Sequence, residues 1–153
     1  MKKLLKITAV FLLSSILFLV SCSKASLDNN STDAATDSVT TNLISGKWLV
    51  SSFIEKTEDK TSKFAGTLFT FKANGTVSAT DKNGNISDGS WKFTPAITYY
   101  GSTSTAAIAL NMGISKPLDL LTKTWNFIVS SSTLLKIDSP ELLEDKHVQF
   151  SKQ

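Results

Sequence analysis

Short runs of alternating apolar and polar residues follow one another through the last two thirds of the chain. The first, residues 46–54, places Trp48, Val50 and Ile54 on one face. The others are residues 67–71, 76–80, 86–94, 97–100, 105–112, 123–130, 133–137 and 146–152. Alternation with a period of two is typical of strands that bury one face. Because no run has the 3.6-residue period of a long helix, the pattern predicts an all-β domain.

Turn residues separate these runs. Asn74-Gly75 and Asn83-Gly84 each lie between two of them, and Asn-Gly favours a hairpin because glycine readily adopts a positive φ. Pro95 ends the fourth run because proline has no N–H for a strand ladder. Strands joined by short turns pair antiparallel. About eight of them are expected to close into an up-and-down barrel without a free edge, with an open β-sandwich as the alternative.

Large rings dominate the predicted inward face. An eight-stranded barrel has room for its own side chains or for one small ligand. Burial of each ring stabilises the domain by roughly 1.5–3 kcal/mol even without a ligand. The sequence is therefore compatible both with a filled core and with an apolar pocket. Tyr99 and Tyr100 are expected near the barrel mouth, where they could contact something outside. The candidate ligand-binding residues are Trp48, Phe69, Phe71, Trp91, Phe93, Tyr99, Tyr100, Trp125 and Phe127, and Phe150 shares the inward face.

Residues 1–22 have a different pattern. Three lysines precede an apolar run over residues 7–20. These 14 residues would span about 21 Å as a helix, whereas the hydrocarbon core of a bilayer is about 30 Å thick. A basic start, a short apolar middle and a small-residue exit predict a removable export signal rather than a transmembrane helix.

The segment Leu19-Val20-Ser21-Cys22 resembles the lipobox of bacterial lipoproteins. The resemblance implies cleavage before Cys22 and attachment of lipid to its sulfur. Two or three acyl chains, at about 0.8 kcal/mol per buried methylene, would hold the protein on a membrane essentially permanently. Cys22 is the only cysteine, so an intramolecular disulfide is excluded.

Residues 23–42 contain mainly Ser, Thr, Asp, Asn and Ala, with only Leu27 and Val39 as larger apolar residues. Such a segment buries too little surface to offset its ordering entropy, so a flexible spacer is predicted. The expected organisation is therefore a signal peptide at 1–21, a lipidated cysteine and disordered tether at 22–42, and a barrel domain at 43–153.

Charge limits the possible partners. All 16 basic residues are lysines, and removal of the three in the signal leaves 13 against 13 acidic residues, a net charge of about zero. Nucleic acid is therefore not an expected partner. The absence of arginine also disfavours phosphate recognition.

No catalytic set can be assembled from the residues. The sole histidine, His147, is expected on the solvated face with Asp145, opposite Val148 and Phe150. There is no His/Cys spacing for zinc, no Gly-x-Ser-x-Gly and no glycine-rich phosphate loop. Neither an enzyme, a metal nor a cofactor is predicted.

Several short motifs together indicate a family. They are Gly46-Lys47-Trp48, the segment from Phe71 to Val77, Gly89-Ser90-Trp91 and Trp125-Asn126-Phe127. In this order they resemble the lipocalin-like domain of exported lipoproteins from Bacteroidetes, over residues 44–151. The resemblance implies that Trp48 packs across the closed end of a barrel. Lipocalins cover that tryptophan with an arginine from a late strand, which this chain lacks.

Two functions are expected from these observations. The first is a lipid-anchored lipoprotein of the cell envelope, most simply in the outer membrane, whose barrel binds a small apolar or amphipathic ligand without catalysis. The alternative is an accessory lipoprotein with a filled barrel core that docks another envelope protein.

Overall fold

The structure, a computed structural model, describes residues 30–153. The predicted signal peptide, Cys22 and the first part of the predicted spacer lie outside these residues. Helix α1 (Asn30–Ile44) precedes the strands, and two short 3-10 helices, η1 (Thr61–Phe64) and η2 (Leu118–Leu121), lie between them. Within residues 30–153, no helix combines the length and the apolar content needed to cross a bilayer.

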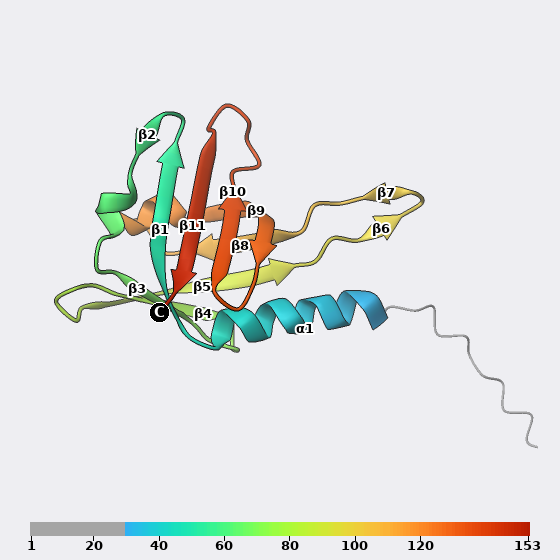
Figure 1. Ribbon diagram of the computed structural model, residues 1–153, viewed down its shortest axis with the longest axis horizontal. Helices are drawn as coiled ribbons and strands as arrows, with labels where there is room; N and C mark the ends of the chain where they lie inside the picture. Colours follow the sequence, from blue (N-terminus) through green and yellow to red (C-terminus); the bar gives the residue numbers. More distant parts are fainter. Residues whose placement is uncertain (1–29) are drawn as a thin grey trace, which may run out of the picture.

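Eight antiparallel strands form a closed barrel (Figure 1). Each pairs with the barrel strands before and after it in the chain, and β11 pairs with β1 to close the ring. The predicted eight-stranded up-and-down barrel is therefore confirmed, and the sandwich alternative is not. The barrel strands are β1 (Lys47–Glu55), β3 (Leu68–Phe71), β4 (Thr76–Thr80), β5 (Ile86–Thr94), β8 (Ala107–Asn111), β9 (Lys123–Ser130), β10 (Leu134–Asp138) and β11 (Lys146–Lys152).

Three two-residue strands lie outside this ring. β2 (Glu58–Asp59) pairs with the end of β1. β6 (Thr98–Tyr99) and β7 (Ser102–Thr103) pair with each other in a separate ribbon. Figure 1 shows this ribbon projecting well beyond the barrel, between β5 and β8.

The prediction of a flexible tether is wrong for residues 30–42, which belong to helix α1. Composition favoured disorder because the helix has few apolar residues of its own. Its last turn is held by the barrel. Leu43 is fully buried in the barrel core, and Val39 packs against that core.

The carboxyl end of α1 receives hydrogen bonds from two barrel strands. The indole N–H of Trp48 donates to the Leu43 carbonyl at 2.9 Å, and Lys152 Nζ donates to the Asn42 carbonyl at 3.0 Å. Carbonyls in the last turn of a helix lack partners within it, and a cation there interacts favourably with the helix dipole. The barrel therefore stabilises a helix that its own sequence would not.

Two irregularities in strand pairing change which residues face inward. The β1–β11 register shifts between Val50 and Ser52, and an extra residue in one strand reverses the alternation beyond it. Phe53 is consequently fully buried, whereas Ile54, predicted to face inward, is only half-buried. A second shift, between β9 and β10, leaves Val129 40% exposed, although it alternates along the chain with Trp125 and Phe127 and simple alternation would place it inward.

Glycines occupy the predicted turns and one crowded strand position. Gly75 has φ +81° and Gly84 φ +85°, the left-handed backbone that the Asn-Gly pairs predicted. Gly89 lies within β5, where a Cβ would stand 2.2 Å from the carbonyl oxygen of Asn111 on β8. The glycine of the Gly89-Ser90-Trp91 motif is therefore required by the close approach of two strands.

Candidate functional site

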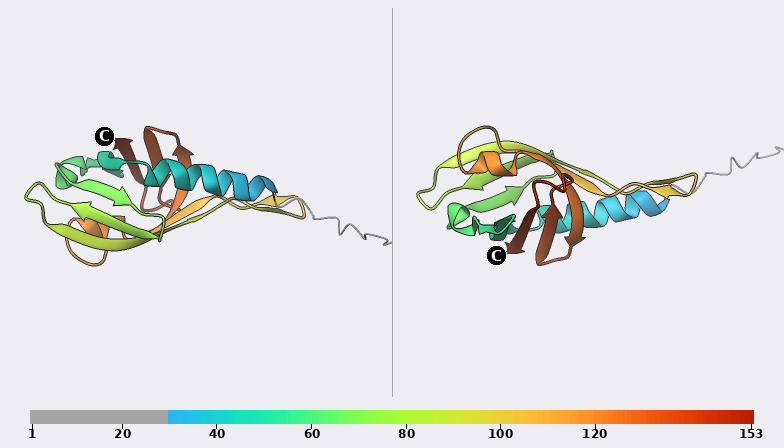
Figure 2. Two further views of the ribbon diagram at one scale, coloured as in Figure 1. Left: turned by 90° about the horizontal axis from the view of Figure 1, so that it is seen from below. Right: turned by 90° about the horizontal axis from the view of Figure 1, so that it is seen from above.

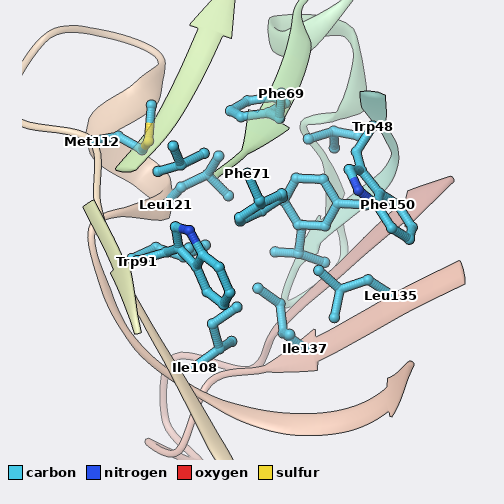
Figure 3. Packing of buried hydrophobic residues seen from close by; sticks show 14 of the residues in the cluster. Trp48, Phe69, Phe71, Trp91, Ile108, Met112, Leu121, Leu135, Ile137 and Phe150 are labelled. Carbon is cyan, nitrogen blue, oxygen red and sulfur yellow. The ribbon is translucent and has the colours of Figure 1, made fainter. Parts of the chain in front are cut away.

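The barrel interior is filled by its own side chains (Figure 3). Trp48, Trp125 and Phe150 are fully buried, and Phe69 and Phe71 nearly so. Their rings form perpendicular pairs at favourable separations. The centroid distances are 5.5 Å for Phe69–Phe150, 5.5 Å for Phe71–Trp91 and 6.4 Å for Phe53–Trp125.

The three indole N–H groups all donate to main-chain carbonyls. Besides the bond from Trp48 to Leu43, Trp91 donates to the Lys72 carbonyl at 3.0 Å and Trp125 to the Leu121 carbonyl at 2.9 Å. A tryptophan has only this one donor. The indole N–H groups are therefore all engaged within the protein, and none is left to donate to a ligand.

Phe93 and Phe127 lie at the barrel mouth. Both are only partly buried, and their ring centroids are 4.8 Å apart. The residues just beyond them belong to the two chain segments that leave the barrel for the ribbon: Thr94 ends β5, and the Phe127 N–H donates to the Ala106 carbonyl at 2.8 Å. Of the candidate rings that lie in the barrel, Phe93 and Phe127 are therefore the two that are accessible at its end.

Tyr99 and Tyr100 do not join the other rings. They lie at the tip of the β6–β7 ribbon, 71% and 91% exposed, with their ring centroids 4.4 Å apart. Two buried rings were missed by the sequence prediction: Phe53, which follows a bulge, and Phe64, which lies on η1 and stacks on Phe53 at 5.5 Å. The chain around Phe64 has no alternating pattern that could have revealed it.

Lysine replaces the arginine that lipocalins place over the first tryptophan. Lys152 Nζ, from the last strand, lies 4.9 Å from the centre of the Trp48 ring, within the range of a cation–π interaction. The same ammonium group donates to Ser45 Oγ at 2.7 Å. Trp48, predicted on the inward face, is completely buried, and its indole lies where α1 meets the barrel.

His147 lies on the outer face, as predicted. Its side chain is 53% exposed. Nδ1 lies 2.9 Å from an Asp138 oxygen, and Nε2 lies 3.0 Å from an Asp145 oxygen. Hydrogen bonds to Asp138 and then to Asp145 raise the histidine pKa above its usual value. Among residues 30–153, no group of three or more His, Cys, Asp or Glu side chains is arranged to hold a metal ion.

Among several grooves on residues 30–153, two are formed mainly by barrel strands. One, of about 270 Å³, lies beside His147 and includes Ser52, Lys136 and Gln149. The other, of about 550 Å³, is lined mostly by polar side chains, among them Lys92. Small-molecule sites are usually concave and predominantly apolar. Both grooves are open to solvent along the barrel wall, so neither would enclose a small molecule.

The loop of residues 139–145, between β10 and β11, presents two exposed leucines, and we call it the leucine loop. Leu142 and Leu143 are 93% and 92% exposed. The loop is fastened to β9 by Lys123, which pairs with Glu141 and Glu144.

Further contacts hold the leucine loop in place. Ser139 Oγ lies 3.0 Å from Lys123 Nζ and 2.9 Å from a Glu144 oxygen. Hydrogen bonds from Lys123 and then from Ser139 lower the Glu144 pKa to about 2. The two leucines are thus displayed on an ordered loop rather than on a loose one.

Comparison with known proteins gives structural neighbours but no family match. No family model and no curated protein matches the chain. The crystal structure of a DUF4847 family protein from Bacteroides vulgatus aligns with a TM-score of 0.49 and 22% identity, over 72% of this chain and 96% of its own. An uncharacterised protein from Bacteroides eggerthii aligns with a TM-score of 0.46 and 12% identity, over 71% and 98%.

A third neighbour is a lipocalin-like protein from Bacteroides uniformis, with a TM-score of 0.42 and 16% identity, over 73% of this chain and 99% of its own. Since all three TM-scores are below 0.5, the fold is identified from its own strand order and closure. The chain forms a lipocalin-like antiparallel barrel and resembles these Bacteroides proteins, as its motifs predicted.

Proposed function

We propose that this protein is a lipid-anchored, non-catalytic component of the bacterial cell envelope. Its barrel serves as a solid support, and its exposed loops bind another envelope protein. The filled barrel interior is the observation that carries this proposal. Eight-stranded barrels that hold a ligand keep part of the interior free for it, whereas here the inward rings contact one another and are almost completely buried.

The anchor in this proposal is a lipid on Cys22. It rests on the lipobox-like segment Leu19-Val20-Ser21-Cys22. We place the protein in the outer membrane, with either side of that membrane as its working side. The barrel then needs no membrane-spanning element of its own.

The leucine loop is the proposed docking surface. Full burial of a leucine side chain contributes roughly 1.5–3 kcal/mol. Leu142 and Leu143 are both exposed in the isolated chain, so burying them against a partner would contribute this free energy to binding. A loop already ordered by Lys123 would lose little conformational entropy on binding a partner.

Binding of a small apolar or amphipathic molecule is the second candidate function. The half-buried Phe93–Phe127 pair at the barrel mouth favours it, because a ligand could lie on these rings without entering the core. Such a ligand would be bound at the rim and not enclosed.

Site-specific photo-crosslinking in intact cells tests the docking proposal. A benzophenone side chain at position 142 of the full chain is expected to give a discrete protein adduct, and one at position 83, in the exposed turn between β4 and β5, is expected to give none. Leu143→Ser should lower the adduct yield at position 142 severalfold. Equal yields at the two positions, or no adduct at position 142, would contradict the proposal.

A further inference from the structure

The ribbon that leaves the barrel mouth is an ordered structure. We call residues 95–106 the arm. β6 and β7 pair within it, Tyr99 opposite Ser102. The Ser104 N–H donates to the Ile97 carbonyl at 2.9 Å. The Thr98 and Thr103 hydroxyl oxygens lie 2.9 Å apart. The arm is therefore a defined hairpin that extends β5 and β8 beyond the barrel.

The turn at the tip of the arm is conformationally costly. Its two central residues, Tyr100 and Gly101, have φ +47° and φ +79°. A two-residue hairpin turn with positive φ at both positions usually has Asn-Gly. Left-handed backbone is unfavourable for a residue with a side chain, and the Tyr100 side chain is 91% exposed, so barrel packing does not offset this cost. Strain of this kind often marks a functional position.

The arm carries no charge. No charged residue occurs between Lys92 and Lys116, although residues 96–105 are all exposed. Ile97, Tyr99 and Tyr100 are 57%, 71% and 91% exposed. Tyrosine is enriched where membranes meet water, since its ring is apolar and its hydroxyl can remain hydrated. An uncharged arm can also leave water without the desolvation penalty of an ion.

The arm points toward the end of the molecule at which α1 begins. Figures 1 and 2 show the first turn of α1 and the tip of the arm at the same end of the molecule, in every view. Cys22 precedes Asn30 by eight residues, which span at most about 28 Å even when fully extended. A lipid on Cys22 would therefore keep a bilayer near the end of the molecule that carries the arm.

We propose that the tip of the arm, with Tyr99, Tyr100 and Ile97, inserts into the headgroup region of the membrane that holds Cys22. This inference rests on the lipid anchor of the proposed function. The anchor and the arm would be two separate contacts, so they would fix the orientation of the barrel on the membrane. Because the arm is uncharged, its insertion should not require anionic lipid.

A single fluorescent label can test this contact in the full lipidated chain. The chain has no cysteine besides Cys22, and a lipidated Cys22 has no free thiol, so Ser102→Cys provides one reactive thiol beside the tyrosines. Asn83→Cys, in the turn at the opposite end of β5, is the matched control. Both variants are labelled with an environment-sensitive nitrobenzoxadiazole dye and reconstituted in phosphatidylcholine vesicles, with and without phosphatidylglycerol.

At position 102 the dye emission is expected to shift to the blue, and most of its quenching by aqueous iodide should be lost, equally in both vesicle types. At position 83 the dye should behave as it does in water. Tyr99→Ser/Tyr100→Ser should abolish the shift at position 102 while the protein still floats with the vesicles. A dye at position 102 that remains as exposed as the one at position 83, on protein that floats, would overturn the arm contact alone. Failure of the unlabelled wild-type chain to float would overturn the anchor and this inference with it.

Discussion

Replacing Trp125 with alanine is expected to lower the free energy of unfolding by about 3–5 kcal/mol. The ring is fully buried and packs against Phe53 at 6.4 Å between centroids. Its removal leaves a cavity and also deprives the Leu121 carbonyl of its indole donor. A loss of this size is a large fraction of the unfolding free energy of a typical small domain. Urea denaturation followed by circular dichroism measures it.

Two variants serve as controls for the Trp125 prediction. Trp125→Phe keeps most of the ring volume and should lose clearly less stability than Trp125→Ala. Val129→Ala, on the same strand but 40% exposed, should change stability by less than about 1 kcal/mol. A Trp125→Ala variant as stable as Val129→Ala would mean that the interior is not tightly packed around this ring.

Replacing Cys22 with alanine is expected to abolish membrane attachment through a lipid. An alanine offers no sulfur for acylation, and each acyl methylene removed from the bilayer costs about 0.8 kcal/mol. The variant should accumulate as an unprocessed precursor or appear in the soluble fraction, whereas the wild-type chain should enter the detergent phase on Triton X-114 partitioning. Ser23→Ala, one residue later, should behave like the wild type. Unchanged retention and processing of the Cys22→Ala chain would contradict the anchor.

Alternation and turns predicted most of the barrel because both signals are local. Strand β8 illustrates this, since Ile108, Leu110 and Met112 alternate in the sequence and are all buried. Closure also followed, because consecutive antiparallel strands leave two edges that can pair. The Trp48, Phe69 and Phe71 rings were correctly expected inside.

The features that were missed depend on contacts between distant residues. The last turn of helix α1 needs a hydrogen bond from Lys152, at the far end of the chain, besides the one from the nearby Trp48, and its own composition contains no sign of this. The bulges that bury Phe53 and expose Val129 arise from how two strands pair. The projection of the arm beyond the barrel could not be predicted either. The sequence of a short hairpin does not show whether it connects two barrel strands directly or extends them away from the barrel.

The central claim is that the barrel interior is full, and xenon binding tests it most directly. Xenon enters apolar cavities that are empty or loosely packed. The purified wild-type protein should show no saturable xenon site by NMR, whereas Phe71→Ala, which removes a buried ring from the interior, should acquire one. A saturable site in the wild-type protein, lost when a fatty acid is added, would contradict the solid barrel and establish an internal ligand pocket instead.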